Sequence, residues 1–132
     1  MRAHLIALAL AGCTASSLDV TGTPVGCDVL GGEVDGVITD PVGALTAFGP
    51  IQASLSMPDQ ITLTDGVLSL VIDIADTPRE ISLVFPGRPV FSENGKLVLD
   101  QDTACYAGRF VAFFQYHGQI SGWFAAPIPS SP

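Results

Sequence analysis

The chain has 132 residues and carries 13 acidic against 5 basic side chains, which gives a formal net charge of −8. This negative charge repels phosphate backbones and excludes nucleic acid as a partner, while the length suits one domain and not two. Residues 13–78 contain no lysine or arginine. Their acidic groups are scattered, which favours a solvated surface over the alternative, a docking face for a cationic partner or divalent cations.

The first residues have the features of an export signal. Arg2 provides a positive charge, and residues 5–11 form an uninterrupted apolar run that ends on small side chains. A helix that crosses a bilayer needs about 20 apolar residues, so this run predicts a signal and not a membrane span. Cys13 stands directly after it.

The sequence Leu10, Ala11, Gly12, Cys13 resembles the lipobox of bacterial lipoprotein precursors. The resemblance implies cleavage between Gly12 and Cys13 and acylation of Cys13, and two or three acyl chains hold a protein stably on a membrane. In the enteric members of this family an aspartate after the cysteine favours inner-membrane retention. Thr14 stands there instead, which implies the outer membrane in a host that has one. A plain secretory signal with a chance cysteine is the alternative.

The other two cysteines, Cys27 and Cys105, would then lie outside the cytoplasm, where disulfides persist. We expect them to pair with each other, which would stabilise the fold by about 4 to 5 kcal/mol through restriction of the unfolded chain. A two-cysteine metal site is the alternative, but the sequence offers no second pair of ligands at zinc spacing.

Four segments follow from these features. Residues 1–12 are the predicted lipoprotein signal peptide, residues 13–26 the lipidated cysteine and a flexible tether, residues 27–126 the folded domain, and residues 127–132 a disordered tail of proline and serine.

The domain shows short alternating stretches between turn residues and no helical periodicity. This pattern predicts an all-β fold, a single antiparallel β-sandwich or small barrel of about 8–9 strands. The expected strands before the last two hairpins are residues 33–39, 44–48, 51–57, 61–64, 67–74 and 80–85.

Turn residues predict three hairpins. A two-residue turn at Asp65 and Gly66 would set Leu63 opposite Leu68 and Ile61 opposite Leu70. Proline and glycine at residues 86–89 would end the strand before them. A second hairpin around Asn94 and Gly95 would join residues 90–92 to residues 97–99, with Glu93 facing Lys96.

The last hairpin is the most apolar part of the domain. A loop at residues 116–118 would set Phe114 opposite Ile120. Apolar side chains fall on both faces, which predicts a central strand pair; an exposed aromatic face for a ligand, glycan or protein is the alternative. The alternation from Gly108 to Phe124 resembles the closing hairpin of small β-rich bacterial lipoproteins, a resemblance that implies no activity.

Residues capable of chemistry are few. His117 is expected to be a polar turn residue, since a catalytic triad would need a partner carboxylate and an activated serine, and residues 118–122 do not have the spacing of a nucleophile elbow. Asp100 and Asp102 are candidates for a calcium site, although such a site needs six to eight oxygen ligands. The sequence contains no phosphate-binding loop and indicates no cofactor.

Two functions remain open from the sequence. The first is a non-catalytic lipoprotein whose membrane-anchored β domain binds a protein or glycan of the cell envelope or has a structural role there. The second is a lipid-anchored hydrolase or metal-dependent enzyme that would gather acidic residues in one concave pocket.

Overall fold

The structure, a computed structural model, describes residues 19–57, 59–75, 80–91 and 94–128. The predicted signal peptide, Cys13 and most of the predicted tail therefore lie outside the described residues. Its strands are β1 (Gly31–Asp35), β2 (Val37–Thr39), β3 (Leu45–Ala47), β4 (Gln52–Met57), β5 (Gln60–Thr64), β6 (Ser69–Asp73), β7 (Ile81–Phe85), β8 (Arg88–Phe91), β9 (Asn94–Gln101), β10 (Cys105–Phe114) and β11 (Gly118–Pro127).

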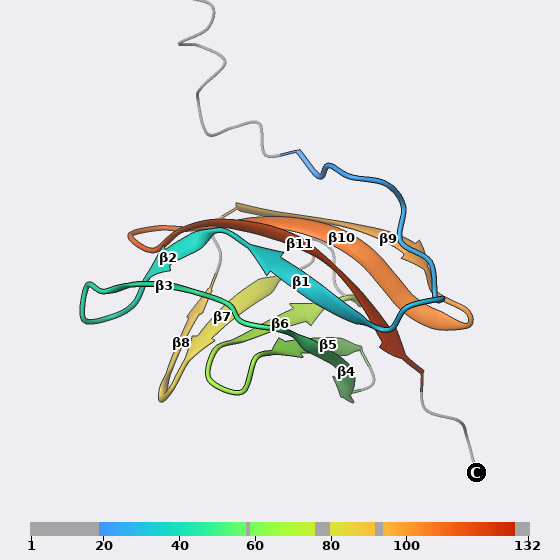
Figure 1. Cartoon of the computed structure of the whole chain (residues 1–132), viewed down its shortest axis with the longest axis horizontal. Helices are drawn as coiled ribbons and strands as arrows, with labels where there is room; N and C mark the ends of the chain where they lie inside the picture. The colour runs from blue at the N-terminus through green and yellow to red at the C-terminus, as the bar shows by residue number, and fades with distance from the viewer. Residues whose placement is uncertain (1–18, 58, 76–79, 92–93, 129–132) are drawn as a thin grey trace, which may run out of the picture.

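The strands form two layers (Figure 1). One is the antiparallel sheet β1-β11-β10-β9, and the other is the antiparallel sheet β4-β5-β6-β7-β8; β2 and β3 form a small hairpin at one end. None of these sheets closes on itself. The all-β sandwich predicted from the sequence is therefore confirmed, and its alternative, a small barrel, is not what forms. The described part contains no helix that could cross a bilayer.

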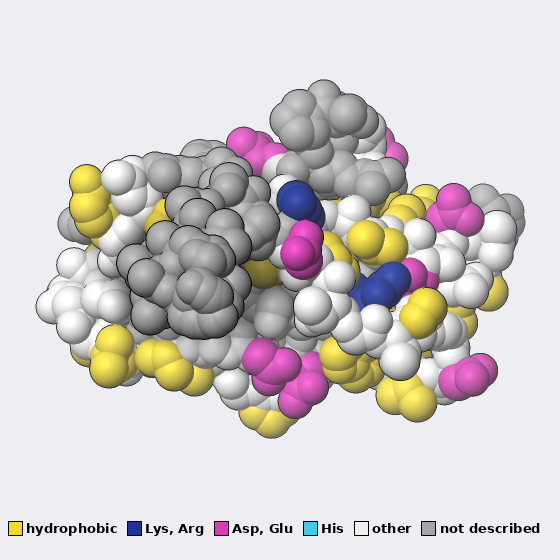
Figure 2. Space-filling view, turned by 90° about the horizontal axis from the view of Figure 1, so that it is seen from above, with side chains coloured by type: hydrophobic (Ala, Val, Ile, Leu, Met, Phe, Trp, Pro, Cys, Tyr) yellow, Lys and Arg dark blue, Asp and Glu magenta, His cyan; other side chains and the backbone are white. Residues whose placement is uncertain are grey.

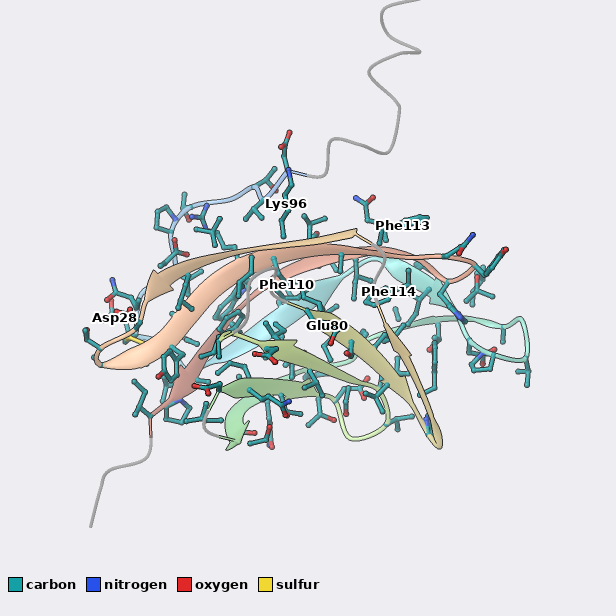
Figure 3. All side chains as sticks on the ribbon, turned by 180° about the vertical axis from the view of Figure 1, so that it is seen from behind. Asp28, Glu80, Lys96, Phe110, Phe113 and Phe114 are labelled. Atoms are coloured by element: carbon teal, nitrogen blue, oxygen red, sulfur yellow. A yellow bond between two sulfur atoms is a disulfide. The ribbon has the colours of Figure 1, made fainter. Side chains whose placement is uncertain are left out.

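The core lies between the two layers, and it is formed by the strict alternation of buried and partly exposed side chains along the strands. In β5, β6 and β7 every second side chain is buried, because successive residues of a strand point to opposite faces. The opposite layer supplies aromatic rings, and Figure 3 shows Phe110 and Phe114 pointing between the sheets. The largest fully buried side chains are Phe110, Phe114, Phe124, Ile38, Ile61, Leu63, Leu70, Ile72, Ile81, Leu83 and Ile120.

The hairpin between β5 and β6 forms, but its predicted register is wrong by two residues. Leu63 pairs with Leu70 and not with Leu68. The loop is longer because the Asp65 carboxylate accepts the N–H groups of Val67 at 2.8 Å and Leu68 at 2.7 Å, and Leu68 turns into the core. A shift of two leaves every side chain on its predicted face.

The last hairpin differs in the same way. Phe114 pairs with Gly118 and not with Ile120, because the loop consists of residues 115–117 with Tyr116 in the left-handed region at φ 70°. The core-facing residues again stay on their face. Strand β10 lies between β9 and β11, which confirms the prediction of a central strand. Pro127 still pairs with Cys105, so the strand extends past the predicted domain boundary.

The end predicted for the strand before Pro86 is confirmed, since β7 ends at Phe85, and Pro86 and Gly87 form a tight turn that pairs Phe85 with Arg88. The second predicted hairpin is wrong. No hairpin forms at Asn94 and Gly95, because both residues belong to β9 and pair with β10, whereas β8 pairs with β7 in the opposite sheet. The turn propensity of Asn94 and Gly95 is overridden because the apolar strand β10 needs a hydrogen-bonded neighbour at each edge. Glu93, the predicted partner of Lys96, lies outside the described residues.

Candidate functional site

The outer face of the β1-β11-β10-β9 sheet carries the polar side chains that the core face lacks. Trp123 of β11 lies opposite Glu33 of β1 on one side and Arg109 of β10 on the other. Asp35 lies opposite Ser121 and is therefore diagonal to Trp123. Figure 3 shows Phe113 and Lys96 on this outer side of the sheet.

Residues 21–29, named here the strap, precede β1 and run along this outer face (Figure 1). The disulfide between Cys27 and Cys105 fastens one end of the strap to the start of β10, with 5.9 Å between the Cα atoms. Val25, Cys27 and Trp123 pack around the buried residues at the start of β10 and in β11. The predicted pairing is thus confirmed, and part of the predicted flexible tether is in contact with the domain.

Arg109 and Asp100 fasten the middle of the strap. The Arg109 guanidinium donates to both carboxylate oxygens of Asp100, at 2.9 and 2.7 Å, and its third contact is the Gly22 carbonyl oxygen at 2.8 Å. Asp100 also accepts the Val25 N–H at 3.0 Å. The hydrogen bonds from Arg109 hold the pKa of Asp100 below its usual 3.8, although burial acts to raise it. The hydrogen bond from the Val25 N–H also lowers the pKa.

Replacing Asp100 by asparagine is expected to lower the melting temperature by about 5 °C, because the Arg109 charge loses its anionic partner and the hydrogen bond from the Val25 N–H loses its charged acceptor. The matched control is Asp19→Asn, which removes a wide, exposed ion pair to Lys96 (3.9 Å) and should cost less than about 2 °C. Since the pKa of Asp100 is lowered on folding, its contribution is present above pH 3.8 and is lost as the pH falls through the lower folded value. Equal effects of the two substitutions would contradict this role.

A pocket of about 480 Å³ opens between the strap and the sheet. Its floor is formed by Ser121, Gly122 and Trp123, and Asp35 stands at its β1 side. We name it the strap pocket; its lining residues are Thr21, Gly22, Thr23, Pro24, Val25, Gly26, Asp28, Val29, Asp35, Arg109, Phe110, Ser121, Gly122 and Trp123. An aromatic side chain beside a few polar groups in a volume of this size is typical of a binding site.

A second hollow of about 520 Å³ lies between the β2-β3 hairpin and the loops that follow β5 and β7. Val42 and Val67, which are 87% and 68% exposed, line it together with Phe85. The Asp40 carboxylate caps its own turn by accepting the N–H groups of Val42 and Ala44. Asp40 is the only charged group of this lining and one of its oxygens is occupied by its own turn, whereas the strap pocket has several charged groups beside an indole ring, so the strap pocket is the better candidate.

Of the residues considered from the sequence for metal binding or catalysis, Asp100 and His117 make structural contacts and Asp102 is exposed. Both carboxylate oxygens of Asp100 bind Arg109, while Asp102 is exposed, and the described residues hold no group of three potential metal ligands. His117 lies in the last turn as predicted. Its Nδ1 is 2.6 Å from the Thr39 carbonyl oxygen and its ring packs on Phe85 at 5.3 Å, so it joins the turn to β2.

Sequence reasoning missed the strap pocket and the Arg109–Asp100 pair. One signal was present, since Arg109 is the single cation within the apolar residues 105–114. A charge in a central strand needs a partner nearby, and the preceding strand offered Asp100.

No family model matches the chain, and comparison with curated proteins and with solved structures gives no significant match.

Proposed function

We propose that the protein is a bacterial lipoprotein of the cell envelope, outer-membrane in a host that has one, and that its β-sandwich is a non-catalytic binding module with the strap pocket as its ligand site. The observation that carries the proposal is the Cys27–Cys105 disulfide. Disulfides persist outside the cytoplasm, where a lipobox would direct the chain. Because the chain has three cysteines, this pair leaves the thiol of Cys13 for acylation.

The position of the strap adds a constraint on the anchored domain. The described chain begins at Asp19, beside Lys96 on the outer face. Only a few residues separate Cys13 from Asp19, and at roughly 3.3 to 3.6 Å per residue they span about 20 Å at most. A lipidated Cys13 would therefore keep the sandwich close to the membrane surface, closer than a free tether up to residue 26 would.

Sedimentation of membranes tests the proposal. Native protein is expected in the membrane pellet and to be released by detergent but not by 1 M salt, because acyl chains and not charges hold it. The variant Cys13→Ala should be absent from the pellet. Native protein that stays soluble, or a variant that sediments equally, would contradict the anchor.

A further inference from the structure

We propose that the strap pocket binds the arginine side chain of a basic segment in a partner protein, an inference that rests on the proposed role of this pocket as the ligand site. Three features carry it: unpaired carboxylates at the pocket, an indole ring on its floor, and a neighbouring site on the same face that already holds a guanidinium. Each of these features belongs to residues fixed by the sheet or by the strap.

The pocket has a surplus of negative charge. Asp28 and Asp35 line it and are exposed, and their carboxylates make no hydrogen bond or ion pair with another described residue. The only cation of the lining, Arg109, is neutralised by Asp100. Figure 2 shows the same pattern over this face, where the basic groups in view lie beside acidic ones. A cationic group would therefore be attracted, and an anionic one repelled.

Trp123 selects among cations. Asp35 and Trp123 are diagonal neighbours on adjacent strands, which places the two residues about 7 to 8 Å apart, within reach of one long side chain. A planar guanidinium can stack on the indole while it donates two hydrogen bonds to a carboxylate. An ammonium headgroup of a lipid fits less well, because its adjoining phosphate would lie against Asp28 and Asp35.

The same face shows that it can hold a guanidinium. Arg109 is bound there by one carboxylate and by a strap carbonyl, with only 15% of its side chain exposed. The proposed ligand would repeat this arrangement with Asp35 or Asp28 as the carboxylate and Trp123 as the flat surface.

Fluorescence of the purified full-length protein tests the proposal, because Trp123 is the single tryptophan of the chain. The probe is a blocked tetra-arginine peptide, and the matched neutral probe replaces each arginine by citrulline. We expect a saturable change in Trp123 emission with the arginine peptide, weakened by added salt, and none with citrulline. Equal responses to both peptides, or no response to arginine, would overturn the proposal.

Substitutions locate the site. Asp35→Asn should weaken binding of the arginine peptide about tenfold, since it removes a charged acceptor. Asp102→Asn makes the same change at an exposed residue outside the pocket and should leave affinity unaltered. The Asp35 carboxylate has no partner among the described residues, so an unchanged melting temperature is the check that the Asp35→Asn domain is folded. Equal weakening by the two substitutions would mean diffuse charge attraction and would overturn the pocket as the site.

Two further probes separate this inference from the proposed function. If Trp123 emission responds to a neutral oligosaccharide, or to vesicles with ammonium headgroups, but not to the arginine peptide, arginine is not the ligand. The strap pocket would then remain the binding site for another ligand. Membrane attachment through Cys13 is measured by sedimentation and is independent of every peptide titration.

Discussion

Replacing Phe124 by alanine is expected to lower the free energy of unfolding by about 3 to 5 kcal/mol. The phenyl ring is fully buried and lies against Gly108, its neighbour across β10 and β11. Gly108 has no side chain to move into the space, and a Cβ there would meet the Val98 carbonyl oxygen, so the cavity would stay empty. Chemical denaturation of the oxidised protein measures the loss.

The matched control for this substitution is Phe113→Ala. Phe113 belongs to β10 but points to the outer face, where it is only half-buried (Figure 3). Removing the same atoms there should cost less than half as much, because partly exposed apolar area contributes less on folding. A smaller loss for Phe124→Ala than for Phe113→Ala would contradict the assignment of the core face.

Removing the disulfide is the second large change. The double variant Cys27→Ala, Cys105→Ala is expected to lose about 2 to 5 kcal/mol of stability, because the bond joins residues 78 positions apart and restricts the unfolded chain. The variant should also bind the tetra-arginine peptide more weakly, since the strap then loses its covalent link and is held by hydrogen bonds to Arg109 and Asp100 and by the packing of Val25. Denaturation with and without reductant, read by circular dichroism, measures the effect.

Reduction of the wild-type protein is the control for this variant, because it breaks the bond and leaves the side chains in place. Reduced wild type and the double variant should unfold at similar denaturant concentrations, both well below oxidised wild type. If oxidised and reduced protein have the same stability, the bond does not contribute as proposed.

The faces of the strands could be predicted from the sequence, and the registers could not. Alternation fixed which side of β5, β6 and β7 is buried, because the side-chain period of a strand is two. The register depends on the loop, and Asp65 lengthened its loop through hydrogen bonds to Val67 and Leu68 that no turn preference anticipates. Both registers therefore moved by two residues without moving a side chain to the other face.

The site was less predictable than the fold. Cysteine number predicted the pairing of Cys27 with Cys105, because only one pair remained after Cys13. The strap pocket brings Asp35 and Trp123 together from strands far apart in the sequence, and the pairing of β1 with β11 decides this. At Asn94 and Gly95 the local sequence predicted a turn, but pairing with strand β10 places both residues in strand β9.

The most direct test of the central claim is the intact mass of the protein extracted from membranes, compared with the Cys13→Ala variant. Our account predicts a native chain that starts at Cys13, carries the added mass of two or three acyl chains, and reveals two thiols only on reduction. An unacylated native chain, or one that retains residues 1–12, would contradict it.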